Sequence, residues 1–148
     1  MNSKNIGNIG EAKTITKFVE YGIPVYIPFG DNERADLIAE FNGKLNKIQV
    51  KTSVKAEDGY MRFDCTSSTA HRLNGSKHIY TKDEIDYFAL YNIQRDKLFL
   101  IKVEDCPTTI CIRYEKPKNN QVKGIRMEED YLFEKVLCVE TLYETPKQ

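Results

Sequence analysis

The sequence contains no tryptophan, only two histidines and five prolines, and carries no formal net charge. Its 22 lysine and arginine residues equal its 22 aspartate and glutamate residues, so the basic surplus usual for nucleic-acid-binding proteins is missing. No apolar run approaches the roughly 20 residues that a membrane-spanning helix needs, which argues against a membrane partner. Charged residues at 30% and hydrophobic residues at 41% are typical of an ordinary soluble globular protein.

The few cysteines also exclude a kind of site. Cys65, Cys106, Cys111 and Cys138 form no C-x-x-C pair, and neither histidine is adjacent to one of them. The ligand spacing of a zinc site is therefore absent. Because residues 1–13 contain no apolar signal-peptide core, we expect a cytoplasmic protein whose thiols are reduced and mostly buried.

A length of 148 residues fits one domain, with residues 140–148 expected to fray. Apolar residues at helical spacing predict an N-terminal helix that Ser3 or Asn5 caps and that Gly22 ends. Residues 67–82 are polar and are expected to form a loop with a short helix around 69–73, or a mobile segment. A final helix is expected over residues 127–137. Apolar and aromatic runs predict strands at residues 25–29, 35–41, 44–53, 61–65, 86–93, 97–104 and 108–114.

This order of elements indicates an α/β or α+β domain with a mixed sheet. Within it, Asn42-Gly43 is a strong signal for a two-residue hairpin turn. A turn centred there places Asp36 directly opposite Gln49, and directly opposed residues share a face of the sheet. Lys51 lies on the same side of its strand as Gln49, two residues further on. The hairpin therefore gathers a carboxylate, an amide oxygen and an ammonium group.

These groups suit the metal-dependent hydrolysis of phosphodiesters. Carboxylate and amide oxygens bind hard cations such as Mg²⁺, and the carbonyl of Val50 could supply a further ligand. Glu11 would add a second carboxylate if the N-terminal helix packs on the sheet. Lys51 could orient the attacking water or stabilise the transition state. The alternative interpretation is an exposed polar face, which is common on hairpins.

Several segments resemble the PD-(D/E)XK nuclease superfamily, in particular its small single-domain endonucleases related to cyanobacterial intron-encoded homing endonucleases. The segments are NIGEAK, ADLIA, IQVKTS, DYFALYNI, LFLIKV, IRYEKPKNNQ and GIRMEEDYL. The resemblance runs from Asn5 to Phe133. It implies a restriction-endonuclease-like fold, with a central mixed sheet flanked by helices. It also implies Mg²⁺-dependent hydrolysis of DNA, in which Mn²⁺ can substitute.

The resemblance assigns a role to each residue of the hairpin set. Asp36 corresponds to the principal metal ligand, Glu11 to a ligand on the helix, and Lys51 to the catalytic lysine. Gln49 stands where most members carry Asp or Glu, and it supplies an oxygen without a charge, which weakens metal binding. Ala35 stands where the superfamily name has proline. The predicted catalytic set is Glu11, Asp36, Gln49 and Lys51, and the predicted metal ligands are Asp36, Gln49, Val50 and Glu11.

The zero net charge hides an uneven distribution. Residues 113–126 carry five cations and one carboxylate, whereas residues 127–148 carry six carboxylates and two lysines. The neutrality of the whole chain therefore does not exclude DNA. Ser53 either contacts a phosphate or only forms part of its strand. The predicted DNA contacts are Ser53, Arg113, Lys116, Lys118, Asn119, Asn120, Gln121, Lys123 and Arg126.

The leading prediction is a metal-dependent endonuclease that acts on double-stranded DNA, and the resemblance points to the homing type. Cutting both strands requires two active sites, so we expect a homo-oligomer, a dimer or a tetramer. Three alternatives stay open: an enzyme like the Holliday-junction resolvases, an antiphage nuclease, and a catalytically inactive DNA-binding module on the same fold.

Overall fold

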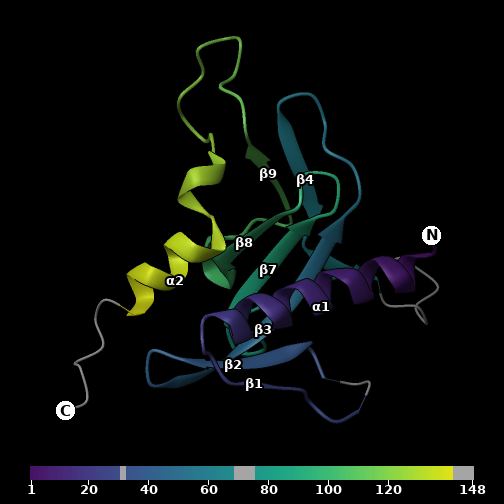
Figure 1. Cartoon of the computed structure of the whole chain (residues 1–148). Helices are drawn as coiled ribbons and strands as arrows, with labels where there is room; N and C mark the ends of the chain where they lie inside the picture. Colours follow the sequence, from purple (N-terminus) through teal and green to yellow (C-terminus); the bar gives the residue numbers. More distant parts are fainter. Residues whose placement is uncertain (31–32, 69–75, 142–148) are drawn as a thin grey trace.

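The computed structural model describes residues 1–30, 33–68 and 76–141. A five-stranded sheet in the order β1-β2-β3-β7-β8 forms its centre (Figure 1). The pair β3–β7 is parallel and the other three pairs are antiparallel, which confirms the predicted mixed sheet. The strands are β1 (Val25–Tyr26), β2 (Leu37–Phe41), β3 (Lys44–Ser53), β7 (Tyr87–Asn92) and β8 (Lys97–Lys102).

Two pairs of strands and two α-helices surround the central sheet. One pair is β4 (Tyr60–Asp64) with β9 (Thr109–Arg113), and the other is β5 (Thr66–Ser68) with β6 (Lys77–Ile79). The helices are α1 (Ser3–Glu20) and α2 (Phe133–Thr141), and two short 3₁₀ turns are η1 (Val103–Asp105) and η2 (Glu128–Asp130). Within the described residues, no helix has both the length and the apolar composition needed to cross a bilayer.

The β2–β3 hairpin has the predicted turn and register. Asn42 and Gly43 have φ angles of 57° and 66°, the left-handed conformation that a type I′ turn requires at both central residues. Leu37 pairs with Ile48, which is the register that the turn predicts. Asp36 lies beyond this last pair, and its N–H donates to the carbonyl of Ile48, so the regular ladder ends before the predicted pair of Asp36 with Gln49.

Each face of the central sheet has its own apolar layer. On one face, Phe18 of α1 and Phe133 of α2 pack together, with ring centroids 4.7 Å apart, over Ile48 and Leu100. On the other face, the β4–β9 pair packs on the sheet through residues such as Phe63, Ile110 and Ile112. Both α-helices thus contribute to the same layer, and α1 runs across β3 and β7 (Figure 1). All six residues of β7 are buried because the strand is covered on both sides.

The segment expected to be a loop contains strands instead. β5 and β6 pair within residues 67–82, with Ser67 opposite His78. Their side chains are mostly polar, so they lack the apolar alternation by which a strand is recognised. The short helix expected around residues 69–73 lies outside the described residues.

The ends of the helices also differ from the predictions. Asn2, not Ser3 or Asn5, caps α1, since its Oδ1 accepts a hydrogen bond from the backbone N–H of Asn5 at 2.9 Å. The predicted final helix starts as the 3₁₀ turn η2, and α2 then continues to Thr141, past the start of the expected frayed tail. Residues 142–148 lie outside the described part of the chain.

The cysteines are only partly buried, which corrects the expectation. All four are thiols rather than disulfides. Cys65 is buried and Cys106 half-buried, and their sulfur atoms lie 3.5 Å apart, but Cys111 and Cys138 are exposed.

Gly10 allows α1 to pack closely on β3. A Cβ atom at this position would collide with Oγ1 of Thr52 and would lie 3.3 Å from Cγ1 of Val50. Both neighbours are β-branched and have few alternative rotamers. Gly10 therefore sets the distance between the sheet and the next residue of the helix, Glu11.

We expect Gly10→Ala to lower the free energy of unfolding by about 1–3 kcal/mol, the usual cost of overpacking a core contact. Gly7→Ala is the matched control, because no atom lies within 4 Å of its added Cβ and alanine favours the helix by up to about 1 kcal/mol. Urea unfolding of both variants measures the difference. Equal stabilisation by the two substitutions would show that α1 does not depend on the close approach.

Candidate active site

The carboxylate of Asp36 is hydrogen-bonded to β3 at the point where β2 separates from it. The backbone N–H of Asp36 still donates to the carbonyl of Ile48 at 2.8 Å. In the same register the next N–H of β3, that of Val50, would face Ala35, but it donates to Oδ2 of Asp36 at 2.9 Å instead. A side chain thus replaces the backbone in the strand pairing, and the carboxylate is held at the edge of β3.

Two uncharged groups on β3, the carbonyl of Val50 and the side-chain amide of Gln49, could also offer an oxygen atom to a metal ion. In an extended strand, the C=O and N–H groups of one residue point to the same neighbouring strand, so the carbonyl of Val50 points to the side where Asp36 is bound. It accepts a long hydrogen bond of 3.4 Å from Nε2 of Gln49. The amide of Gln49 therefore folds back on its own strand, towards the edge of β3 to which Asp36 is bound.

Glu11 brings a second carboxylate from α1. Burial raises the pKa of Glu11, and the negative charge of Asp36 raises it further. Burial also raises the pKa of Asp36, against the opposing effects of the Val50 N–H and the Lys51 ammonium. The charge of Asp36 thus reaches Glu11, and both acids are partly removed from water.

Lys51 lies on the Gln49 side of β3 and is held by two contacts. Its Nζ donates to the carbonyl of Thr66 at 2.7 Å and lies 5.2 Å from the ring centroid of Tyr80. Burial lowers the pKa of Lys51, and the negative charges of Asp36 and Asp64 oppose that shift. The ammonium is therefore partly removed from water and lies within electrostatic reach of Asp36.

This group of oxygens fits a hard divalent cation. In the part of the chain that the structure describes, no three Asp, Glu, His or Cys side chains converge on one point. Glu11 and Asp36 supply two charged donors, and the amide of Gln49 and the carbonyl of Val50 supply two neutral ones. Mg²⁺ commonly binds through one or two carboxylates and keeps several waters, so such a set could hold it and relieve the carboxylate repulsion.

Some of the predicted DNA contacts are exposed, and others are already hydrogen-bonded within the protein. Arg113 and Arg126 are half-buried at the base of a loop, where the Arg113 N–H donates to the Arg126 carbonyl at 2.8 Å. The Ser53 hydroxyl accepts a hydrogen bond of 2.8 Å from the buried Asn92, which favours its structural interpretation. The exposed residues are Lys116, Lys118, Asn119, Asn120, Gln121 and Lys123.

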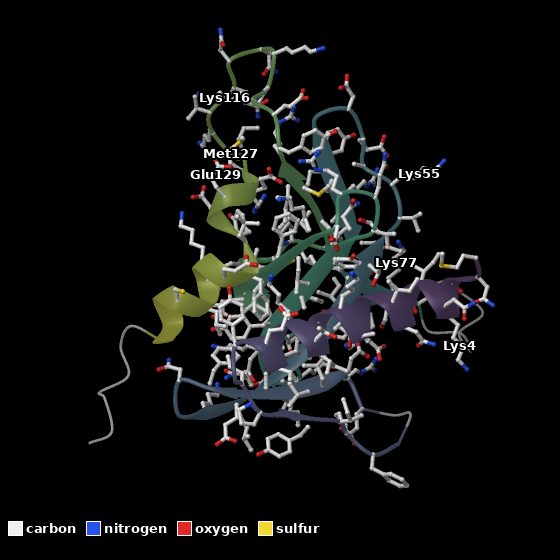
Figure 2. All side chains as sticks on the ribbon, in the orientation of Figure 1. Lys4, Lys55, Lys77, Lys116, Met127 and Glu129 are labelled. Atoms are coloured by element: carbon white, nitrogen blue, oxygen red, sulfur yellow. The ribbon has the colours of Figure 1, made fainter. Side chains whose placement is uncertain are left out.

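The loop between β9 and η2 projects beyond the β4–β9 pair (Figure 1). Figure 2 shows Lys116 on this loop, and Lys55, Lys77 and Lys4 along the side of the molecule where α1 begins. Lys116, Lys118, Asn119 and Gln121 line an open hollow of about 380 Å³. Exposed cations and amides on a protruding loop are suited to contacts with a nucleic-acid backbone.

Sequence reasoning missed the contribution of the β5–β6 pair. Tyr80, which follows β6, is half-buried against the apolar layer of β4 and β9 and has its ring beside the ammonium of Lys51. The contact could not be foreseen because it depends on a hairpin whose strands lack an apolar pattern. The one available signal was an aromatic residue at the end of an otherwise polar segment.

The family can now be stated from a comparison with known proteins. A sequence profile described as PD-(D/E)XK endonuclease matches residues 1–134. The chain belongs to this family. Its fold is similar to that of a solved bacterial homing endonuclease, I-Ssp6803I, with a TM-score of 0.77 and 22% identity over 98% of this chain and 100% of that one. No curated protein sequence matches the chain.

Membership of a PD-(D/E)XK endonuclease family supports nuclease activity with DNA as the substrate. The structural likeness confirms the expected fold, a central mixed sheet with few helices. The sequence resemblance to this group is therefore confirmed.

Neutral substitutions of the two carboxylates should preserve or increase stability. Folding raises the pKa of Glu11 and Asp36 above their ordinary values of 4.5 and 3.8. A raised carboxyl pKa favours folding below the ordinary value, and this advantage is lost as pH rises through the folded-state pKa. We therefore expect Asp36→Asn and Glu11→Gln to be at least as stable as the wild type at pH 8, with the difference shrinking towards pH 4.

Urea unfolding in EDTA at both pH values measures this effect. Asn can still accept the Val50 N–H, so the substitution at Asp36 removes charge but not the hydrogen bond. Glu129→Gln, at an exposed site, is the control and should change little. A loss of stability at pH 8 in both site variants would show that the carboxylates are not mutually destabilising.

Proposed function

We propose that this PD-(D/E)XK endonuclease is a Mg²⁺-dependent enzyme of the homing type that cleaves double-stranded DNA. The observation that carries the proposal is the Asp36 carboxylate bound to the Val50 N–H, next to Glu11 and within reach of Lys51. The likeness to a bacterial homing endonuclease supports the type.

Four groups of the chain would hold the metal ion: the carboxylates of Asp36 and Glu11, the amide oxygen of Gln49 and the carbonyl of Val50. A bound Mg²⁺ lowers the pKa of a coordinated water and neutralises charge on the phosphate. Mn²⁺ would substitute, because it accepts the same oxygen donors. Asp36 would set the position of the metal ion. Its carboxylate is fixed by the hydrogen bond from the Val50 N–H, and this bond also fixes the direction of the lone pairs that remain for the metal.

Lys51 would act on the attacking water or on the phosphate. An ammonium group has three N–H donors, and the Thr66 carbonyl takes one of them. The others can reach a water molecule and a phosphate oxygen at once. Charge placed in advance where negative charge develops is among the largest contributions to catalysis.

The loop between β9 and η2 would contact the DNA. Its exposed Lys116, Lys118 and Lys123 would neutralise phosphates, and Asn119, Asn120 and Gln121 would donate and accept hydrogen bonds. Arg113 and Arg126 would act mainly by holding the base of the loop. A duplex has two strands to cut, so we propose that the chain works as a homo-oligomer, a dimer or a tetramer.

A second candidate is a DNA-binding module without catalysis. Gln49 favours it, because this residue adds no charge to the site and donates its amide hydrogen to the carbonyl of Val50. A resolvase or an antiphage nuclease would use the same site on a different DNA substrate.

We expect the wild type to nick plasmid DNA in Mg²⁺ or Mn²⁺ and not in EDTA. Asp36→Ala and Lys51→Ala should each reduce the rate by at least about 100-fold, the usual cost of removing a group that stabilises the transition state. Lys47→Ala is the matched control, because Lys47 is exposed on the same strand and the same side. Gel electrophoresis of plasmid and four-way-junction substrates measures all the variants.

Three outcomes would contradict the proposal of a homing-type nuclease that uses Lys51. Tight binding without cleavage in either metal would favour the non-catalytic module. Cleavage confined to the junction would favour a resolvase. If Lys47→Ala lost as much activity as Lys51→Ala, the loss would come from removing any positive charge from β3 and not from a specific role of Lys51.

Neutralising the protruding loop should weaken the salt dependence of DNA binding. Each phosphate contact contributes about 0.9 to the slope of log K against log salt concentration, so Lys116→Gln, Lys118→Gln and Lys123→Gln together should reduce it by up to about 2.7. Fluorescence anisotropy with a labelled duplex measures the slope. Removing three charges near α2, at Lys17, Lys97 and Lys135, should leave it nearly unchanged, and an equal decrease would disprove a specific contact.

A further inference from the structure

The conformation of Lys51 depends on a segment of the chain that carries none of the predicted site residues. Its Nζ lies 5.2 Å from the ring centroid of Tyr80, within the distance at which the face of an aromatic ring attracts a cation. A lysine side chain has four rotatable carbon–carbon bonds and loses much entropy when it is fixed. The carbonyl of Thr66 holds Nζ by one hydrogen bond, and without the ring the ammonium could still turn about that bond towards solvent or towards Asp64, whose charge also acts on it.

The ring of Tyr80 is itself held on two sides. The imidazole of His78 lies 5.3 Å away at an interplanar angle of 82°, and the ring of Phe88 lies 5.4 Å away at 86°. Phe88 is buried in β7 beside Gln49. Edge-to-face packing of this kind fixes the orientation of an aromatic ring.

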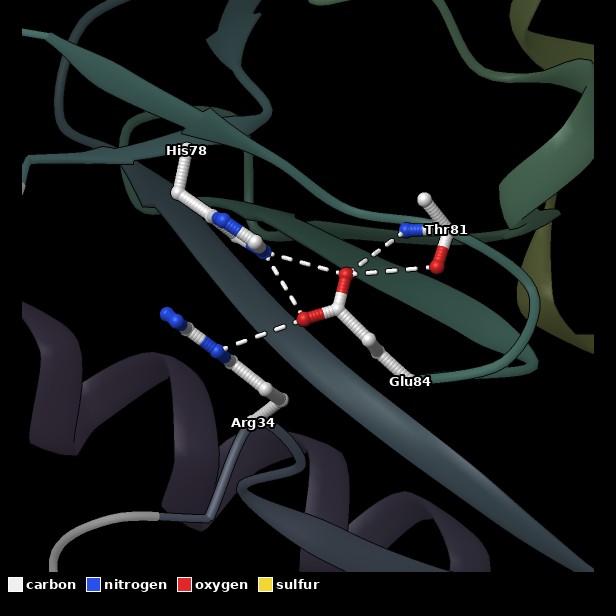
Figure 3. Close-up of polar contacts among 4 residues, drawn as sticks. All are labelled: Arg34, His78, Thr81 and Glu84. Atoms are coloured by element: carbon white, nitrogen blue, oxygen red, sulfur yellow. Dashed lines mark hydrogen bonds and ion pairs between the residues drawn. The ribbon is translucent and has the colours of Figure 1, made fainter.

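Glu84 anchors the segment from both ends. Its carboxylate lies 2.8 and 3.0 Å from Nε2 of His78, and it accepts hydrogen bonds from the backbone N–H and the hydroxyl of Thr81 at 3.1 and 3.3 Å. Nε of Arg34 lies 3.3 Å from the other carboxylate oxygen. Figure 3 shows these three partners converging on Glu84. His78 and Thr81 lie on either side of Tyr80 in the chain, so Glu84 holds the imidazole of His78 before it and the backbone and hydroxyl of Thr81 after it.

We infer that Tyr80 is a positioning residue that holds the ammonium of Lys51 at the active site, and that Glu84 keeps Tyr80 in place. The inference rests on the proposed function of Lys51. The part of Tyr80 that acts is its aromatic face, which lies against the ammonium. The segment between β6 and β7 is therefore part of the catalytic apparatus, although none of its residues need touch the substrate.

Two substitutions distinguish the contribution of the aromatic face of Tyr80 from that of its hydroxyl. Tyr80→Leu removes the aromatic face and keeps an apolar side chain, whereas Tyr80→Phe keeps the face. Small displacements of a catalytic group can cost about 100-fold in rate, so we expect Tyr80→Leu to lower kcat by about 10- to 100-fold. The KM for DNA should stay within about threefold, and Tyr80→Phe should keep kcat within about twofold, since Tyr80 makes no proposed contact with DNA.

The control is a second lysine–tyrosine contact on the opposite face of the sheet. Lys13 lies 5.9 Å from the ring centroid of Tyr91, and Tyr91 pairs with Thr52, next to Lys51 but pointing the other way. Tyr91→Leu should lower the melting temperature and leave kcat within about twofold when it is measured well below that temperature. An equal loss of kcat in Tyr80→Leu and Tyr91→Leu would show that the effect of Tyr80→Leu comes from a general loss of stability and not from the contact with Lys51.

An NMR measurement tests the contact independently of cleavage. Protons above an aromatic face are shifted upfield, so the ε-methylene signal of Lys51, assigned by its absence in Lys51→Ala, should be upfield in the wild type and in Tyr80→Phe. It should return to the ordinary lysine position in Tyr80→Leu. An ordinary signal in the wild type would overturn the contact.

The kinetic results decide the positioning role separately. Wild-type kcat in Tyr80→Leu, or equal damage in Tyr80→Phe, would overturn it even if the NMR contact is present. Failure of the wild type to cleave DNA at all would reject the proposed function, and with it any catalytic role for Tyr80, while the NMR signal would still establish whether Lys51 is held by the ring.

Discussion

The hydrogen bond between the Asp36 carboxylate and the Val50 N–H is the interaction on which the site depends. It ends the pairing of β2 with β3 and leaves a charged group at the edge of the sheet. Its position follows from the Asn42-Gly43 turn, which sets the register of the hairpin. Gly10 then lets α1 approach β3 closely enough to bring Glu11 beside Asp36. A turn, a register and a missing Cβ atom thus combine to place two carboxylates together.

The charges of this site oppose folding. Burial raises the pKa of both carboxylates and lowers that of Lys51, so each charged form is less favourable here than in water. Perturbed acids and bases of this kind concentrate at functional sites. The structure offsets part of the cost with the Val50 N–H, the Thr66 carbonyl and the ring of Tyr80. A bound cation would offset the remaining repulsion between the acids.

Local signals account for what the sequence predicted well. The hairpin register needed only the turn, and α1 needed only apolar spacing, so the pairing of β2 with β3 up to Leu37 and the shared side of Gln49 and Lys51 could be predicted. The β5–β6 pair could not, because its strands are polar and only their partners distinguish them from a loop. The same holds for the Thr66 carbonyl and Tyr80, which reach Lys51 through that pair. The superfamily resemblance assigned roles to Glu11, Asp36, Gln49 and Lys51 but said nothing of the groups that support them.

Locating a bound metal ion tests the central claim most directly. In crystals grown with duplex DNA and Mn²⁺, the anomalous scattering of manganese marks the position of the ion without assumptions about activity. We predict a peak within bonding distance of the carboxylates of Asp36 and Glu11 and of the Val50 carbonyl, and no peak there in Asp36→Asn. A manganese ion bound elsewhere on the chain, with Asp36 contacting only the Val50 N–H, would contradict this account.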